Sequence, residues 1–210
     1  MQNLSEYANP KMKLQRLVTS GQFFPVARGV YETDKNTAGY LLAECIYSPS
    51  YLSFEFALSF HGLIPETVYA YTSATFKKRK KKFHPTSFGN FYYKDIPASV
   101  FYYEVLILNE DGYFFKIASP EKAICDTIYS VSPVRNLKEI ETLLLDDLRI
   151  DWDDLEKLNL NTIEEIAPLY RSGNVALLAK FLKRKIKWIL SFLKCLNIMN
   201  LTLPMTEKML

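Results

Sequence analysis

The sequence predicts an α+β protein: a truncated winged-helix module, a larger domain with a β-sheet packed by helices, and a C-terminal helix. The 210-residue chain is 49% hydrophobic and 14% aromatic, which is typical of a globular protein with a real core. Stretches rich in β-branched and aromatic residues alternate with stretches that carry helix-capping signals. We expect the three parts to span residues 1–35, 36–175 and 176–210.

The first expected element is a short helix over residues 10–20. Asn9 is a suitable N-cap, Pro10 suits the first helical position and Gly21 suits the stop. Two short apolar runs then flank "PVARG", whose proline and glycine favour a turn, so residues 23–31 are expected to form a hairpin. A short helix followed by a tight hairpin is the second half of a winged helix. Only "LSEY" precedes this helix, so a full three-helix domain does not fit.

The middle of the chain mixes both kinds of element. Capping and spacing predict helices over 38–47, from Ser53 to Gly62, over 119–131, and, as two or three acidic helices, from Leu137 to about Tyr170. Alternation and β-branched content predict strands over 67–76, 88–96 and 100–119, the last divided by a turn at "EDG".

The C-terminal segment begins as a basic amphipathic helix. Its apolar face comprises Leu178, Phe181, Leu182, Ile186, Ile189 and Leu190. Its polar, solvent-facing side comprises Lys180, Lys183, Arg184, Lys185 and Lys187. Such a helix can lie on a membrane surface, but covering a core or binding a partner is the more common use.

Charge is unevenly distributed along the chain. The net charge is only +3, yet residues 136–166 carry −7, so the remainder carries +10. This asymmetry permits a basic face that binds a polyanion. Cys45, Cys125 and Cys195 are far apart and odd in number, which predicts neither a disulfide framework nor a zinc site and favours a reducing cytoplasm. We expect no signal peptide and no membrane span, because no apolar stretch is suitable for either.

Sequence signatures of enzymes are absent. The chain has no GxGxxG, no P-loop and no GxSxG. His61 and His84 are not spaced as metal ligands, and no acidic-x-Lys motif of a restriction-type nuclease occurs. The acidic stretch "DDLRIDWDD" could hold a hard cation, but a solvated helix face is the usual explanation. We therefore expect no enzymatic activity, no cofactor and no metal, and rank a nuclease as a distant third class.

The candidate functional residues are basic and polar groups suited to binding DNA. On the first helix they are Lys11, Lys13, Gln15 and Arg16, of which arginine and glutamine can pair with base edges in a major groove. Arg28, at the expected hairpin tip, could reach a minor groove or a phosphate, as a wing does. An ordinary surface helix and hairpin would explain the same residues equally well.

An unbroken basic run forms the second candidate. It comprises Lys77, Lys78, Arg79, Lys80, Lys81 and Lys82, and Phe76 and Phe83 bracket it. Such a run would contribute phosphate contacts and a salt-dependent affinity but no sequence readout. The alternative is a solvated hairpin tip, where six neighbouring cations are best tolerated.

Four motifs occur in an order and spacing found in one family. They are "GQFFPVARGVYET", "SYLSFEFALSFHGLIPE", "YTSATFKKRKKKF…GNFYYKDI" and "ASPEKAICDTIY". Over about residues 10–170 the chain resembles AbiEi-type antitoxins, the predicted transcriptional regulators of bacterial abortive-infection (phage-defence) systems. Members usually have a full opening helix and turn, of which only "LSEYANPKMKLQRLVTSGQF" remains here.

The resemblance implies both a fold and a function. It implies an N-terminal winged helix-turn-helix that represses the system's own promoter by binding inverted repeats. It also implies a larger antitoxin domain that counteracts a nucleotidyltransferase-like toxin in a type IV arrangement, for which no stable complex is required. Helix 10–20 would be the recognition helix and Arg28–Gly29 the wing.

The expected function is thus a cytoplasmic, DNA-binding antitoxin and autorepressor, acting as a homodimer or as cooperative monomers. The alternative is a protein-interaction module that does not bind DNA and engages a toxin or another partner directly.

Overall fold

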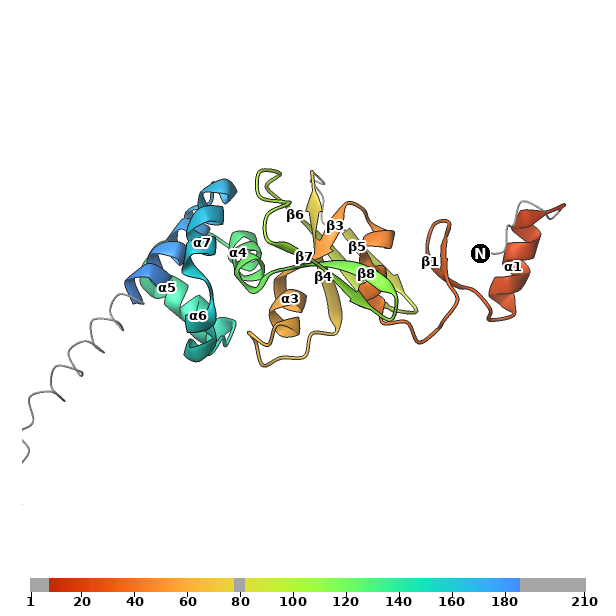
Figure 1. The fold of residues 1–210 in the computed structure, drawn as a ribbon, viewed down its shortest axis with the longest axis horizontal. Helices are drawn as coiled ribbons and strands as arrows, with labels where there is room; N and C mark the ends of the chain where they lie inside the picture. The colour runs from red at the N-terminus through yellow and green to blue at the C-terminus, as the bar shows by residue number, and fades with distance from the viewer. Residues whose placement is uncertain (1–7, 78–81, 186–210) are drawn as a thin grey trace, which may run out of the picture.

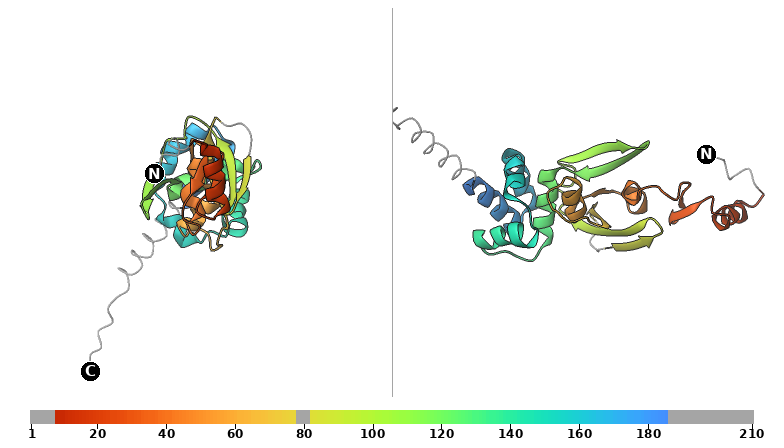
Figure 2. Two further views of the ribbon diagram at one scale, coloured as in Figure 1. Left: turned by 90° about the vertical axis from the view of Figure 1, so that its right-hand side faces the viewer. Right: turned by 90° about the horizontal axis from the view of Figure 1, so that it is seen from below.

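The computed structural model describes residues 8–77 and 82–185. The chain is a mixed α+β protein, as the sequence predicts (Figure 1). A β-sheet occupies the middle of an elongated molecule, the N-terminal helix stands at one end, and a group of helices forms the other end (Figures 1 and 2).

The predicted N-terminal helix and hairpin are both present. Helix α1 (Pro10–Thr19) begins as expected, because the Asn9 side chain accepts a 3.2 Å hydrogen bond from the Met12 backbone amide. The hairpin consists of β1 (Phe24–Ala27) and β2 (Val30–Glu32), joined by Arg28 and Gly29. In α1 only Leu17 is buried, so this helix makes little contact with the rest of the chain.

The main sheet has six strands in the order β5-β6-β4-β3-β8-β7. Their bounds are β3 (Ser50–Leu52), β4 (Ala70–Phe76), β5 (Lys82–Thr86), β6 (Gly89–Ile96), β7 (Val105–Glu110) and β8 (Tyr113–Ala118). The β4–β6 and β3–β8 pairs are parallel and the other neighbours are antiparallel. A central antiparallel pair is therefore flanked on each side by a hairpin, β5–β6 or β7–β8.

Four short helical segments pack next to the sheet. The helix expected over 38–47 is a 3-10 turn, η2 (Gly39–Leu42), followed by α2 (Ala43–Ile46). Helix α3 (Phe54–Phe60) follows β3 at once. Helix α4 (Pro120–Ser130) is capped by Ser119, as predicted, and each residue from 122 to 128 is buried. A helix buried on all sides belongs in the middle of a molecule, and α4 lies between the sheet and the C-terminal helices (Figure 1).

The C-terminal group confirms the expected acidic helices. It contains α5 (Leu137–Thr142), a π-helical turn η3 (Leu143–Asp147), α6 (Trp152–Lys157), α7 (Leu160–Ile166) and a 3-10 turn η4 (Ala167–Tyr170). Residues 173–185 are helical, and Leu178, Phe181 and Leu182 are buried there as their spacing predicts. The rest of the predicted amphipathic helix, including Ile186, Lys187, Ile189 and Leu190, lies outside the described residues.

The sheet order corrects one prediction about the basic run. The prediction that the run forms the tip of a hairpin between two paired strands is wrong, because β6 lies between β4 and β5 in the sheet. The run instead connects two strands that are not neighbours. Of its residues, Lys77 and Lys82 are described and residues 78–81 lie outside the description. Strands β3 and β5 are additions that the sequence patterns did not predict.

Candidate nucleic-acid interface

The exposed surface of α1 carries most of the predicted DNA-binding side chains. Lys11, Gln15 and Arg16 are exposed, whereas Lys13 is half-buried. Lys11 and Gln15 are one helical turn apart and lie on the same side of the helix. Leu17 turns inward, and Leu14 and Val18 are half-buried beside it. The helix therefore buries one side chain and leaves Lys11, Gln15 and Arg16 accessible.

Arg28 lies in the two-residue turn between β1 and β2, where it is exposed. Gly29 has a φ of +81°, a conformation that glycine adopts without steric cost, which permits the tight turn. From Ala8 to Tyr31 the chain contains four cations and no acidic residue. The projecting N-terminal end is consequently positive over its whole described length up to β2.

Two hydrogen bonds attach the first hairpin to the main sheet, one at the edge strand β5 and one at β8, the strand next to the opposite edge. A ring nitrogen of His84, on β5, lies 3.0 Å from the Val26 carbonyl oxygen of β1. The Tyr113 hydroxyl, on β8, donates a 3.0 Å hydrogen bond to the Glu32 carboxylate at the end of β2. Glu32 is buried, and its other oxygen accepts from the Thr33 and Asp34 amides. His84 thus has a structural role, and the hairpin is held against the sheet.

A cleft of about 530 Å³ separates α1 and the hairpin from the turn of β5–β6. Its lining residues are Val18, Phe23, Phe24, Pro25, Val26, Ala27, Arg28, His84, Pro85, Thr86 and Ser87. The cleft brings Arg28 and the end of α1 into one region of the surface. Lys77 and Lys82 do not line it.

The basic run is separate from this region. Lys77 is exposed at the end of β4, with its Nζ 5.0 Å from the centroid of the Phe76 ring. Lys82 opens β5, and its Nζ lies 4.1 Å from the centroid of the Tyr47 ring, a cation–π arrangement. The structure therefore places Arg28 and Val18, near the end of α1, on one cleft, and leaves the described ends of the basic run on the body of the sheet.

A fully buried polar network connects the sheet to the C-terminal helices. The Nζ of Lys122 lies 2.8 Å from Asp126 Oδ1, and neither side chain is exposed. Lys122 also donates to the Tyr170 hydroxyl at 2.7 Å, and that hydroxyl donates to Asp126 at 2.6 Å. The other carboxylate oxygen of Asp126 accepts from Tyr51 at 2.9 Å and from Ser53 at 2.7 Å.

Burial affects the chemistry of this network. Desolvation, together with the nearby Asp126 carboxylate, raises the pKa of Tyr51 and of Tyr170 well above the usual tyrosine value. Because its members are sealed from solvent, the network cannot meet a substrate. It joins β3, α4 and η4, so its role is to hold the sheet and the C-terminal group together.

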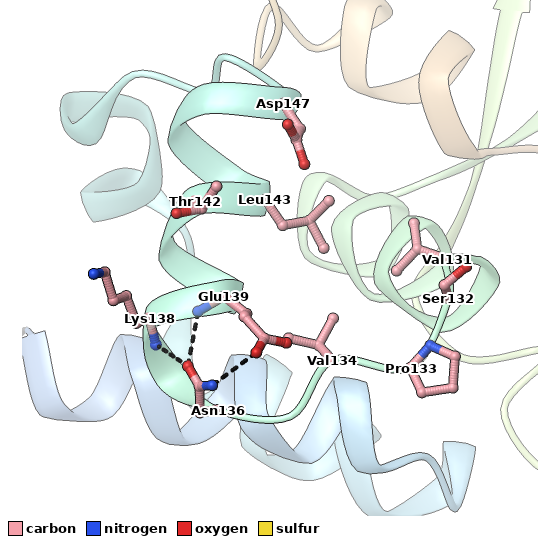
Figure 3. Close-up of a pocket in the computed structure, with 10 residues that line it drawn as sticks. All are labelled: Val131, Ser132, Pro133, Val134, Asn136, Lys138, Glu139, Thr142, Leu143 and Asp147. Carbon is pink, nitrogen blue, oxygen red and sulfur yellow. Dashed lines mark hydrogen bonds between the residues drawn. The ribbon is translucent and has the colours of Figure 1, made fainter.

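The cavity drawn in Figure 3, of about 570 Å³, lies between the segment after α4 and the α5–η3 helix. Three of its lining residues bond to one another: the Asn136 side chain accepts from the amides of Lys138 and Glu139 and donates to the Glu139 carboxylate. This is an N-cap with a reciprocal glutamate contact. The arrangement explains why α5 begins here and presents no nucleophile paired with a base.

His61, just past the end of α3, also has a structural role. One of its ring nitrogens lies 2.7 Å from the carbonyl oxygen of Ala118, the last residue of β8. Within residues 8–77 and 82–185, no group of three or more histidine, cysteine, aspartate or glutamate residues is arranged to hold a metal ion. In the same ranges no helix is long and apolar enough to cross a membrane.

The patterns in the sequence did not indicate the network around Lys122. The available signal was a lysine and an aspartate four residues apart in a helix whose intervening residues, Ala123, Ile124 and Cys125, are apolar. A comparison with protein-family models finds no match, and no curated protein matches the chain.

Proposed function

We propose that the chain is a DNA-binding antitoxin and autorepressor of the AbiEi type, and not an enzyme. In this proposal α1 enters a major groove of promoter DNA that carries inverted repeats, and Arg28 contacts the flanking backbone. The six-stranded domain counteracts a nucleotidyltransferase-like toxin, for which no stable complex is required. The site of action would be the cytoplasm.

One observation carries the DNA-binding part. The projecting end of the molecule holds exposed Lys11, Arg16 and Arg28 and has no acidic residue from Ala8 to Tyr31. Phosphates attract such a surface, and the exposed Gln15 and Arg16 have the donor geometry that reads adenine and guanine edges. The net charge of −7 over residues 136–166 belongs to the opposite end, so it would not repel the DNA there.

The test is binding to the DNA upstream of the chain's own gene, measured by fluorescence anisotropy between 50 and 200 mM salt, a range of roughly fourfold over which phosphate contacts dominate the change. Wild-type protein is expected to prefer this DNA over a scrambled duplex. Arg16→Ala should relax that preference, since it removes a base-reading side chain at a cost of about 1–3 kcal/mol. Arg28→Ala should lower the salt slope by about 0.9 for one lost phosphate contact.

A matched control is Arg135→Ala, which removes one exposed arginine from the C-terminal end of the molecule. It should leave affinity and preference unchanged. Neutralising the basic run should flatten the salt slope without altering preference, as expected for an auxiliary phosphate clamp. The proposal would be contradicted if the wild-type protein showed no preference for promoter DNA over the scrambled duplex. Equal losses of that preference in Arg16→Ala and in Arg135→Ala would also contradict it.

The antitoxin part needs a separate measurement. Co-expression with a nucleotidyltransferase-like toxin encoded beside this gene should restore growth, and Arg16→Ala should retain that rescue while losing repression. If restoration of growth is lost only in variants of the sheet domain, then toxin neutralisation and promoter repression belong to different parts of the chain.

The second candidate is a protein-interaction module without DNA binding. The observation that favours it is apolar surface on the β7–β8 hairpin, where Ile107 and Phe114 are 66% and 74% exposed. This second function predicts that the protein restores growth in the presence of the toxin and shows no preference for promoter DNA.

A further inference from the structure

The two edge strands of the main sheet differ sharply. β5 contains Pro85, which lacks a backbone N–H, and begins with Lys82. Proline and lysine on an edge strand are common means of preventing further pairing. β7 has the sequence Val-Leu-Ile-Leu-Asn-Glu, with no proline and no lysine. Its one charged residue is Glu110, at its end. An uncharged, apolar edge of this kind is a template for another strand.

Several large apolar side chains on and around β7 are exposed to solvent. By alternation along the hairpin, Val105, Ile107, Phe114 and Lys116 lie on one face. Ile107 is 66% exposed and Phe114 74%, and Tyr102, in the turn before β7, is 71% exposed. Large contiguous apolar patches on a protein surface usually mark an interaction site.

A pocket of about 200 Å³ lies beside this face. Its lining residues are Pro49, Ser50, Tyr51, Phe101, Tyr102, Val105, Ile107 and Lys116. Two exposed members of this lining, Tyr102 and Ile107, place the pocket next to the outer edge of β7.

We infer that β7 pairs with β7 of a second copy of this chain, joining two six-stranded sheets across a two-fold axis. An antiparallel edge can be self-complementary, and a two-fold axis perpendicular to the sheet keeps the apolar faces of both copies on the same side. The pairing then needs a register in which apolar residues meet and acidic residues do not.

One register meets that requirement. With the axis at Ile107, Ile107 opposes its own copy, Leu106 opposes Leu108 and Val105 opposes Asn109. Glu110 then meets no acidic strand residue, because Glu104 lies in the turn before β7 with a φ of +53°. An axis at Leu106 would pair only residues 105–107. The register centred on Ile107 places the two copies of this side chain next to each other on the face that lines the pocket, because directly opposed side chains are neighbours on one face.

The interface does not require DNA, so its test is independent of the proposed function. The mass of the full chain should be measured by light scattering and by sedimentation velocity over a concentration series without DNA. Wild-type protein should form dimers. Ile107→Lys should weaken the dimer by tenfold or more, the effect of about 1.4 kcal/mol at an interface centre.

The matched control is Phe83→Lys on β5, where an apolar residue that is 52% exposed lies on the opposite edge. It should leave the dimer intact. Circular dichroism and thermal unfolding of both variants will show whether they remain folded, and Leu106→Lys provides a second substitution on β7. A monomeric wild-type protein, a dimer unaffected by both β7 variants, or a dimer dissociated by Phe83→Lys would overturn the inference. A dimer that fails to bind promoter DNA would contradict only the DNA-binding proposal.

Discussion

Replacing Lys122 by methionine should strongly destabilise the folded chain. The ammonium group is fully buried and donates to Asp126 and to Tyr170. Methionine fills much of the same volume but leaves the Asp126 carboxylate buried without its cation. The carboxylate would keep three neutral donors, from Tyr51, Ser53 and Tyr170.

The magnitude follows from that loss of compensation. Removing one partner from a buried ion pair generally costs about 3–5 kcal/mol, because the remaining charge stays desolvated. The three remaining hydrogen bonds place the expected loss near the lower end, at about 3 kcal/mol. Removing both charges, in Lys122→Met with Asp126→Leu, should cost less than the sum of the two single changes, since no unpaired charge remains.

Urea unfolding followed by far-ultraviolet circular dichroism measures these free energies. Lys94→Met is the matched control: its partner Glu55 lies at 3.1 Å, but the two side chains are 24% and 40% exposed. A partly exposed pair of this kind contributes under about 1 kcal/mol. A loss in Lys122→Met no larger than that in Lys94→Met, or strictly additive losses in the double variant, would refute the reasoning.

Two further predictions concern burial and backbone packing. The pKa of Tyr170 is raised in the folded chain, and an unfolded tyrosine titrates near about 10, so stability should fall above pH 10 as the unfolded chain loses protons that the folded chain retains. Tyr170→Phe should reduce that decline by about 1.4 kcal/mol per pH unit, measured by urea unfolding at successive alkaline pH values, and an unchanged decline would contradict the assignment. Gly39→Ala should lower the thermal midpoint by several degrees, because a Cβ would collide with the Phe88 carbonyl and the Tyr71 ring, whereas Gly173→Ala, with open space around it, should not.

Local signals predicted local structure well. Asn9 with Pro10 and Ser119 with Pro120 start helices where expected, because a capping side chain and a proline act within one helical turn. The β7–β8 turn was predicted from "EDG", and Asp111 and Gly112 both have positive φ there, as a two-residue hairpin turn requires.

Strand order and the shortest strands could not be predicted in the same way. β3 is three residues long and buried at every position, so it has no alternation to detect. β5 is interrupted by Pro85, which argues against a strand unless the strand is known to lie at an edge. The parallel pair β3–β8 joins segments far apart in the chain, the parallel pair β4–β6 passes over β5, and no periodicity in the sequence specifies either pairing.

The candidate site was predicted only in part for a related reason. Exposure of Lys11, Gln15, Arg16 and Arg28 follows from helical spacing and turn chemistry, and the structure confirms it. Their separation from the described ends of the basic run depends on where β5 enters the sheet.

The two proposals meet at the β7–β8 hairpin. β8 pairs with β7 along its whole length and also carries Tyr113, which bonds Glu32 at the end of β2. If β7 pairs with its copy, each first hairpin is held by β8, the strand next to the one that pairs across the two-fold axis, so the two Arg28 turns acquire a defined separation. A defined separation is what binding to an inverted repeat requires, since half-site spacing mirrors the geometry of the dimer. Tyr113→Phe would loosen that connection without altering either surface, so its effect should be confined to the preferred half-site spacing and spare the dimer itself.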